Sequence, residues 1–544
     1  MTLTGKLVDL PGHRIYPAEI LIDHGRIQTV RELSSGEPFT AQYICPGFID
    51  AHVHIESSML IPSEFARLAV VHGTVCTVSD PHEIANVLGL AGVDFMLKNA
   101  LTTPFYFYFG APSCVPATVF ETAGAELDPA AVDQLLSRSE IRYLSEMMNF
   151  PGVLAADPDV MKKIASAKKY GKPVDGHAPG LRGEEAGKYI AAGISTDHEC
   201  FTEDEALDKL SRGMKILIRE GSAARNFDAL AGLLETHWEK MMFCSDDKHP
   251  DSLVKSHINE LCARAVARGI DPLKVLTAAC LNPVLHYGLA PGLLRAGDPA
   301  DFILLRDLKK FEIIQTWIKG EVVAADGHSL LKSTSASSVP NRFSRSPTLP
   351  GDFAFPAFPE KNSPYPYPVI GALDGQLITS KLSVEIKPDN GFWHADPARD
   401  ILKIVVVNRY HDAPVARAFI KNFGLTYGAL ASSVAHDSHN IVAVGTNDEA
   451  LADAVNAVIE QKGGISLSGQ GMRMVLNLPV AGLMSSEDGY RVAETYTAMD
   501  QMAKQLGSGL RAPLMTLSFM ALLVIPHLKL SDRGLFDGDR FGLL

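Results

Sequence analysis

Two histidines separated by one residue, His52 and His54, are the first residues of the chain that could carry out chemistry. They end an apolar run that begins at Pro46. Side chains at positions i and i+2 of a β-strand leave the same face, so the two imidazoles would converge at the end of such a strand. Two imidazoles on one face can bind a transition-metal ion. A single pair of this kind also occurs by chance, so its meaning depends on the residues that accompany it.

Other histidines and carboxylates follow later apolar runs in the first half of the chain. Each one alone has a common structural role, such as capping a helix or a turn. Together they supply imidazole and carboxylate ligands, a mixture that suits zinc, iron or manganese, and a carboxylate can bridge two ions. The candidate metal ligands are His52, His54, Glu146, His177, His198 and Asp246.

The elements that would position these residues form a regular series. Eight apolar or β-branched runs recur in the first half of the chain, and segments with helical character lie between them, for example 84–99, 158–170 and 203–212. Strands alternating with helices in this number predict a (β/α)8 barrel, in which the carboxyl ends of the strands build the active site. The expected strands are 46–54, 75–78, 105–109, 141–144, 173–176, 194–197, 215–218 and 241–244.

Several motifs resemble those of a known family. The run from Pro46 to His54 and the turn Gly297-Asp-Pro-Ala-Asp-Phe302 are similar to motifs of the amidohydrolase superfamily. More narrowly, the segments 54–59, 80–87 and 435–440 resemble the bacterial adenine deaminase family. The resemblance covers nearly the whole chain, including residues 529–535.

The resemblance implies a site with two divalent ions, of which Mn²⁺ or Fe²⁺ is favoured and Zn²⁺ is possible. Many members of the superfamily use a carboxylated lysine to bridge the ions, and this chain offers Glu146 in its place. A homo-oligomer is also implied. One ion would be held by His52, His54 and Asp246, and the other by His177 and His198.

The implied reaction is the hydrolytic deamination of adenine to hypoxanthine and ammonia, a step of purine salvage. A metal-bound water loses a proton near neutral pH and would attack C6 of the purine. Asp246 would accept that proton and pass it to the departing amine. The ring nitrogen that gains electron density needs a proton donor, and Glu83, His82 and Glu56 are candidates because they lie just beyond strand ends. Glu56 is also a candidate substrate-binding residue.

A second polar cluster, residues 436–439, lies between apolar strands near the C-terminus. It could cap a turn or a helix. Alternatively, it could close over the mouth of the barrel and bind the substrate. The sequence leaves both interpretations open. The candidate substrate-binding residues of this cluster are His436, Asp437 and His439.

The composition is that of a globular protein. A chain of 544 residues with 46% hydrophobic and 21% charged residues can form more than one domain. The formal net charge of -13 disfavours nucleic acid as a partner, so a recognised base is expected to be free. The N-terminus lacks a signal-peptide core, no apolar stretch suits a bilayer, and the 7 cysteines show no disulfide framework. We therefore expect a cytoplasmic protein with no membrane partner.

Composition changes along the chain predict its domains. Residues 1–45 and 297–335 both have the pattern of short strands and are expected to form one small β-sandwich-like domain beside a barrel at 46–296. A Ser/Pro-rich linker is expected at 336–366. Residues 367–544 alternate strands with helices and predict a C-terminal α/β or α+β domain.

Two other functions remain open at this stage. A cyclic amidohydrolase, such as a hydantoinase or an imidazolonepropionase-like enzyme, would use the same kind of metal site. A purine-binding pseudoenzyme would keep the barrel without turnover, although none of the expected ligands is missing from the sequence. Ammonia release from adenine, compared with hydantoin, dihydroorotate and imidazolonepropionate, would distinguish the three.

Overall fold

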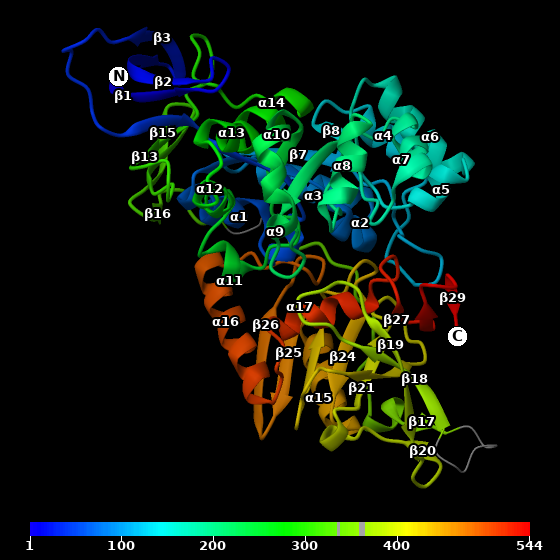
Figure 1. Ribbon diagram of the computed structural model, residues 1–544. Coiled ribbons are helices and arrows are strands. Elements are labelled where there is room, and N and C mark those ends of the chain that lie inside the picture. The colour runs from blue at the N-terminus through cyan, green and yellow to red at the C-terminus, as the bar shows by residue number, and fades with distance from the viewer. Residues whose placement is uncertain (335–337, 358–364) are drawn as a thin grey trace.

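Parallel strands with their helices form one part of the molecule, and a second sheet forms the C-terminal part. The computed structural model describes residues 1–334, 338–357 and 365–544. In Figure 1 the parallel strands and helices, coloured blue to green, lie above the C-terminal sheet, coloured yellow to red. The first strands of the chain lie at one side of the upper part.

Eight short parallel strands carry the helical segments between them, and they form two sheets of five and three strands. The orders are β5-β6-β7-β8-β9 and β10-β11-β12. Every residue of β5 and β6 is buried, which is typical of parallel strands covered on both faces. The strands are β5 (Phe48–Val53), β6 (Thr74–Ser79), β7 (Tyr106–Ala111), β8 (Ile141–Met147), β9 (Val174–Gly176), β10 (Thr196–Asp197), β11 (Lys215–Arg219) and β12 (Met241–Cys244).

Isolated bridges join the edges of these two sheets. One parallel bridge pairs Val53 with Asp246, and another pairs Val174 with Ile194. At the first junction, the N–H of Asp246 donates to the carbonyl of His52 at 2.9 Å, and the N–H of His54 donates to the carbonyl of Asp246 at 3.2 Å. The ends of β5 and β12 therefore meet, although their residues are far apart in the sequence.

The helix expected over 84–99 is two helices. α2 (His82–Leu88) and α3 (Leu90–Ala100) are separated by Gly89, which has φ 60° and ψ -138°, a conformation that suits glycine because it has no Cβ. The other helices of this part are α1 (Pro62–Ala69), α4 (Pro129–Leu136), α5 (Phe150–Leu154), α6 (Pro158–Lys169), α7 (Gly183–Ala191), α8 (Glu203–Ser211), α9 (Phe227–Leu230), α10 (Leu234–His237), α11 (Pro250–Leu253), α12 (Ile258–Ala267), α13 (Pro272–Leu276) and α14 (Asn282–Tyr287).

Segments from both sides of the parallel strands share one eight-stranded sheet, with the order β16-β15-β14-β13-β4-β1-β2-β3. β4 pairs in parallel with β1 and antiparallel with β13. Because β4 ends two residues before β5 begins, this sheet fixes the start of the parallel strands. Its strands are β1 (Thr2–Asp9), β2 (Arg14–Asp23), β3 (Arg26–Glu32), β4 (Tyr43–Pro46), β13 (Phe302–Leu305), β14 (Ile313–Ile318), β15 (Glu321–Ala325) and β16 (His328–Ser329).

The C-terminal part contains a second eight-stranded sheet, ordered β19-β18-β22-β21-β24-β23-β25-β26. Helix α15 (Asp448–Glu460) packs on β23, β24 and β25, and Asn447 caps it by accepting from the N–H of Ala450 at 2.8 Å. The other elements are β17 (Phe355–Pro356), β18 (Tyr365–Gly371), β19 (Ser380–Ile386), β20 (Phe392–Trp393), β21 (Leu402–Val407), β22 (Ala416–Lys421), β23 (Ala429–Ser432), β24 (Ile441–Gly445), β25 (Gly464–Gly469), β26 (Met472–Asn477), α16 (Gly489–Gln505), α17 (Pro513–Ser518), β27 (Leu528–Ser531), β28 (Gly534–Asp537) and β29 (Gly542–Leu543).

The two parts of the molecule are packed together. Helix α16 contacts α1 and α11, and buried apolar residues of both parts form one core. Arg67 on α1 donates to Asp488 at 2.8 Å, and Glu64 accepts from the N–H of Gly489 at 2.9 Å. The expected linker at 336–366 includes residues 336, 337 and 358–364, which lie outside the described residues. Residue 335, where the small β-domain was expected to end, also lies outside them. Within the described ranges, no helix is long and apolar enough to cross a membrane.

Candidate metal centre

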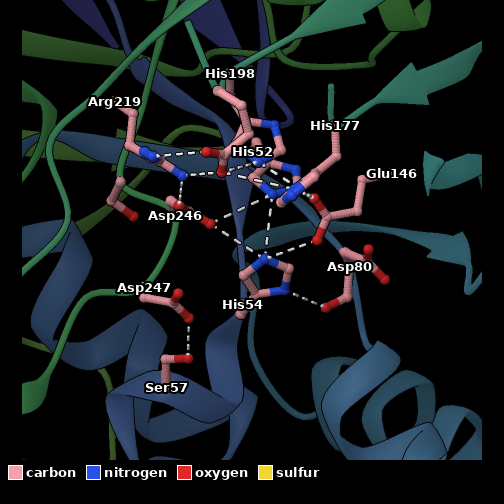
Figure 2. Close-up of polar contacts among 12 residues, drawn as sticks. His52, His54, Ser57, Asp80, Glu146, His177, His198, Arg219, Asp246 and Asp247 are labelled. Carbon is pink, nitrogen blue, oxygen red and sulfur yellow. Dashed lines mark hydrogen bonds and ion pairs between the residues drawn. The ribbon is translucent and has the colours of Figure 1, made fainter. Parts of the chain in front are cut away.

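The end of β5 presents two imidazoles to one carboxylate. The Nε2 atoms of His52 and His54 lie 3.2 Å apart. They lie 3.6 and 3.2 Å, respectively, from Oδ1 of Asp246. All three side chains are buried, and Figure 2 shows them pointing toward one another. The alternation of a strand thus places both rings on one side, as the His-X-His spacing predicts.

Asp246 has an unusual backbone conformation. Its φ of 54° lies in the left-handed region, which costs about 1–2 kcal/mol for a residue other than glycine. The two backbone hydrogen bonds to β5 described above hold it there. Strained conformations of this kind are enriched at functional sites. The strain is consistent with a functional carboxylate at this position.

Glu146, near the end of β8, lies between two groups of histidines. Its Oε1 is 3.3 Å from Nε2 of His54. Its Oε2 is 2.7 Å from Nδ1 of His177 and 3.2 Å from Nε2 of His198. Each oxygen of one carboxylate therefore faces a different group, which is the arrangement that a bridging ligand needs.

The second group of donors lies at the ends of β9 and β10. His177 follows β9 directly and His198 follows β10, and both are buried. Glu199 joins them: its Oε1 is 3.6 Å from Nδ1 of His177 and 3.4 Å from Nε2 of His198. The sequence reasoning missed Glu199, although it stands next to His198 in the motif Thr-Asp-His-Glu.

Arg219, the last residue of β11, connects the two groups. Its guanidinium donates to Oε2 of Glu199 at 3.0 Å and to Oδ2 of Asp246 at 2.8 Å. Burial alone would raise the pKa of Asp246, but Arg219 together with His52 and His54 outweighs burial and holds that pKa well below its usual range. Arg219 was also missed, and the signal for it was an arginine directly after the apolar residues 216–218 of the strand.

This donor set fits divalent cations. Imidazole nitrogens and carboxylate oxygens bind manganese, iron and zinc, and several sets of three or more such groups converge here within 4.8 Å. The Nδ1 atom of His52 is buried without a hydrogen-bond partner among the described residues. Burial alone would raise the pKa of Glu146. His177, His198 and His54 outweigh burial and hold that pKa well below its usual range, so the carboxylate is ionised. Converging donors and an ionised carboxylate are what metal binding requires.

A second polar cluster, called here the Glu83 cluster, consists of Glu83, His436 and His439. Nδ1 of His436 lies 2.5 Å from Oε1 of Glu83, and Nε2 of His439 contacts Oε2. The N–H of Ala435 donates to Nδ1 of His439 at 3.2 Å, so the His439 proton lies on Nε2 and is donated to Glu83. Burial would raise the pKa of Glu83, but His436, His439 and His82 hold it well below its usual range. Burial alone would lower the pKa of His436, but the charge of Glu83 outweighs burial and raises the pKa of His436 to about 9.

The other candidate residues lie around this cluster. His82 lies between Asp80, 3.1 Å from its Nδ1, and the Glu83 cluster, with Oε1 of Glu83 3.4 Å and Oδ1 of Asp437 3.8 Å from its Nε2. Oδ2 of Asp437 is buried without a partner among the described residues. Glu56 accepts from the N–H of Ile84 at 3.2 Å, and burial raises the pKa of Glu56 to about 7.

A cavity of about 30 Å³ lies between the metal donors and the Glu83 cluster. A water molecule needs about 10–15 Å³ by this measure, so a purine can enter the cavity only if residues that line it move. His82, Glu83, His436 and Asp437 line it, whereas Glu56 and His439 do not belong to the described residues that line it. Apolar side chains of the C-terminal part cover it: Leu377, Phe519, Leu522, Val524 and Ile525.

Comparisons with known proteins identify the family. Residues 43–323 match the amidohydrolase family, and residues 376–542 match the adenine deaminase C-terminal domain. The adenine deaminase of Salinibacter ruber (strain DSM 13855 / M31) is 54% identical over 99% of this chain and 98% of its own length. The chain belongs to the adenine deaminase family of amidohydrolases.

Other relatives agree with this assignment. Adenine deaminases of Sulfurovum sp. (strain NBC37-1) and Methanosarcina barkeri (strain Fusaro / DSM 804) are 53% and 52% identical, each over 99% of this chain and 98% of its own length. A β-aspartyl dipeptidase from Fervidobacterium islandicum AW-1 has a solved structure with a TM-score of 0.46 and 18% identity, covering 60% of this chain and 98% of its own. That similarity is too distant to inform the substrate.

Proposed function

We propose that the chain catalyses the hydrolytic deamination of adenine to hypoxanthine and ammonia. The observation that carries this proposal is the 54% identity, over 99% of the chain, to a protein named adenine deaminase. The buried imidazole and carboxylate donors at the strand ends support the same reaction, because hydrolysis of a C–N bond in this superfamily uses a metal-activated water.

We propose two divalent ions per chain, Mn²⁺ or Fe²⁺ in preference to Zn²⁺. When bound, such ions supply a water nucleophile of lowered pKa and stabilise developing negative charge. The two oxygens of Glu146 face different histidine groups, which supports a bridging role. The other proposed ligands are His52, His54 and Asp246 for one ion and His177 and His198 for the other.

Asp246 is proposed to accept the proton of the attacking water and to pass it to the departing amine, because ammonia leaves far more readily than amide ion. Its lowered pKa keeps the carboxylate ionised before the attack. Arg219 holds Oδ2 at 2.8 Å, which leaves Oδ1 directed at His52 and His54. We therefore assign Arg219 a positioning role for this carboxylate.

The Glu83 cluster is proposed to bind the purine and to supply the proton of the ring nitrogen. Nδ1 of His436 donates to Oε1 of Glu83 across a 2.5 Å contact, and both residues line the cavity. Nε2 of His436 is buried without a partner among the described residues, so it can face the substrate. Oδ2 of Asp437, which has no partner in the described ranges, can accept from an N–H of the purine, and His82 lies between this cluster and Asp80. His439 and Glu56 are proposed to act indirectly, by fixing Glu83 and the start of α2.

The remaining features of the proposal concern architecture. We propose that the eight parallel strands close into one (β/α)8 barrel, supported by the two bridges between their sheets. The proposed domains are the barrel at 46–296, a β-domain from 1–45 and 297–335, and a C-terminal domain at 367–544. A homo-oligomer is proposed, and the seven free cysteines support a reducing, cytoplasmic location.

Ammonia release by the manganese-loaded protein tests the proposed function. We expect release from adenine, with hypoxanthine formed in equal amount. Hydantoin, dihydroorotate and imidazolonepropionate serve as alternative substrates. Hydrolysis of one of these in preference to adenine would replace the proposal with a cyclic amidohydrolase. Adenine binding without turnover, in protein of full metal content, would indicate a pseudoenzyme.

A further inference from the structure

A second cavity lies on the other side of the loop that carries Asp246. Asp246 and Asp247 line the catalytic cavity, whereas the next two residues, Lys248 and His249, line a cavity of about 330 Å³. This volume is within the range of about 300–1,000 Å³ that is usual for ligand pockets. Helix α16 contributes Tyr496, so the cavity lies between the two parts of the molecule.

Lys248 is the most informative residue of this cavity. It is 5% exposed and makes no hydrogen bond or ion pair among the described residues. An isolated ammonium is costly to bury, because it loses its hydration without gaining a partner. Its neighbour His249 has a partner for only one of its two ring nitrogens. Nδ1 lies 2.5 Å from the hydroxyl of Tyr496, but Nε2 is buried without a partner in the described part of the chain. The cavity is therefore lined by a lysine in a buried position and by a buried imidazole nitrogen, neither of which has a partner among the described residues.

The carboxylates around the cavity do not serve Lys248. Glu220 pairs with Arg264 at 2.7 Å, Asp500 with Lys504 at 2.5 Å, and Asp251 with Lys255 at 3.9 Å. Glu260 is exposed and accepts from the hydroxyl of Ser256, so water solvates it. Among the described residues that line the cavity, Lys248 is thus the one buried charge without a counter-ion.

We propose that this cavity binds a small molecule that carries a phosphate group, with Lys248 as its central cationic contact. A phosphate monoester carries about -1.5 to -2 charges at pH 7 and three strong acceptor oxygens. The cavity is also lined by the hydroxyls of Ser222 and Ser252, which lie 2.7 Å apart and hydrogen-bond each other, and by two arginines, Arg225 and Arg511, whose guanidinium groups pair with Glu220 at 3.7 Å and with Asp374 at 2.7 Å. A phosphate group would have to share these donors with their present partners. Lysine is a common phosphate ligand because its ammonium acts as a point charge with three donors. The bound group would contact the same loop that places Asp246 in the catalytic cavity.

Calorimetric titration of the metal-loaded full chain with inorganic phosphate and with AMP tests this proposal. Phosphate can also bind the metal ions, so each titration is repeated with saturating hypoxanthine, the proposed product, which is not turned over and competes only at the catalytic cavity. We expect saturable phosphate binding that hypoxanthine does not displace. Lys248→Met should weaken that binding at least about tenfold, because a hydrogen bond to a charged group is lost. Lys248→Arg should retain it, and the exposed Lys188→Met provides the matched control.

Thermal melts of the same proteins give a second readout. With the catalytic cavity saturated by hypoxanthine, phosphate should raise the Tm of the wild type but not of Lys248→Met, because a ligand stabilises only the state that binds it. Should Lys248→Met fail to fold, Arg511→Met at the exposed rim is expected to weaken phosphate binding in a folded protein. The site would be overturned if these variants leave phosphate binding unchanged. It would also be overturned if hypoxanthine displaces all of the saturable phosphate binding. Succinate that binds more tightly than phosphate, and depends on Lys248, would overturn the assignment to phosphate.

Discussion

The metal donors and the Glu83 cluster adjoin one cavity but have different origins. All six proposed metal ligands lie at the ends of the parallel strands, between residues 52 and 246 (Figure 2). Glu83 instead meets His436 and His439, which are 353 and 356 residues away in the sequence. One site belongs to a single part of the chain, whereas the other exists only because the C-terminal part packs against it.

This difference separates two tasks. The strand ends can hold metal without any contribution from the C-terminal part, because their donors face one another directly. The Glu83 cluster adds groups that can donate and accept protons at the opposite wall of the cavity. Substitutions in the two sites should therefore have different signatures, metal content in the first and substrate kinetics in the second.

The largest effect is expected for Glu146→Gln. The amide has no charge to share between the two histidine groups, so the protein should lose metal and more than about 10²-fold in kcat. Metal analysis after gel filtration, beside ammonia release, measures both. Glu140→Gln, in the exposed turn before β8, is the control. A wild-type protein that is fully active with one ion per chain would contradict the bridging role of Glu146.

Asp246→Asn should cost about 10²-fold or more in kcat, as expected for loss of a general acid–base group. Part of the metal should remain, because His52, His54 and Glu146 still face the first ion. Metal content and kcat are compared with those of Asp204→Asn, an exposed position on α8. Turnover within a few-fold of the wild type at full metal content would exclude the proton-transfer role.

His436→Ala and His439→Ala should leave metal content unchanged and should reduce kcat or raise KM for adenine by about 10-fold or more. Each change also leaves Glu83 with one donor fewer, which costs about 1–3 kcal/mol of stability. Steady-state kinetics beside a thermal melt separate the two effects. A lowered Tm with unaltered kcat and KM would show that the cluster serves only to join the two parts.

A buried histidine outside both sites should have the smallest effect, and on stability alone. Nε2 of His72 donates to the carbonyl of Leu253 at 2.8 Å, and burial lowers the pKa of His72 to about 3. Because this folded-state pKa lies below the unfolded value of about 6.5, His72 contributes stability above pH 6.5 that is lost as the pH falls toward 3. His72→Gln keeps a donor but does not titrate. Its free energy of unfolding should therefore fall about 2 kcal/mol less than that of the wild type between pH 7 and about pH 4.5.

Urea unfolding at the two pH values measures this difference. The exposed His24→Gln should behave like the wild type. An identical pH dependence for the wild type and His72→Gln would show that His72 does not titrate as its burial implies.

The sequence was sufficient for the parts of the fold and site that depend on local patterns. Eight apolar runs correspond to β5–β12, and the position of each histidine directly after its strand explains why the rings converge. Glu199 and Arg219 were missed because each resembles an ordinary surface charge until the strand ends are placed side by side. The break at Gly89 was missed because apolar periodicity continues across it, and only its backbone conformation separates α2 from α3.

The contacts of the Glu83 cluster could not be predicted from local sequence patterns. The polar run at 436–439 fitted both a capped turn and a substrate-binding loop, since spacing says nothing about which distant residue a loop will meet. The contact with Glu83 depends on how the C-terminal part packs against the parallel strands and their helices, for example where Asn440 donates to the carbonyl of Thr122 at 2.9 Å. Such packing follows from the shape of two complete surfaces, and no single motif encodes it.

The sheet that contains β4 and β13 bears on how the chain folds during synthesis. Residues 47–301 must be made after β4 before its partner β13 emerges from the ribosome. At about 5–20 residues per second, that interval is on the order of tens of seconds. Throughout it, one edge of β4 is unpaired, and unpaired strand edges are where nascent chains aggregate. The strands that carry the metal donors are thus an insertion within a sheet, and the two ends of that insertion can be joined by pairing of β4 with β13 only after the whole insertion has been synthesised.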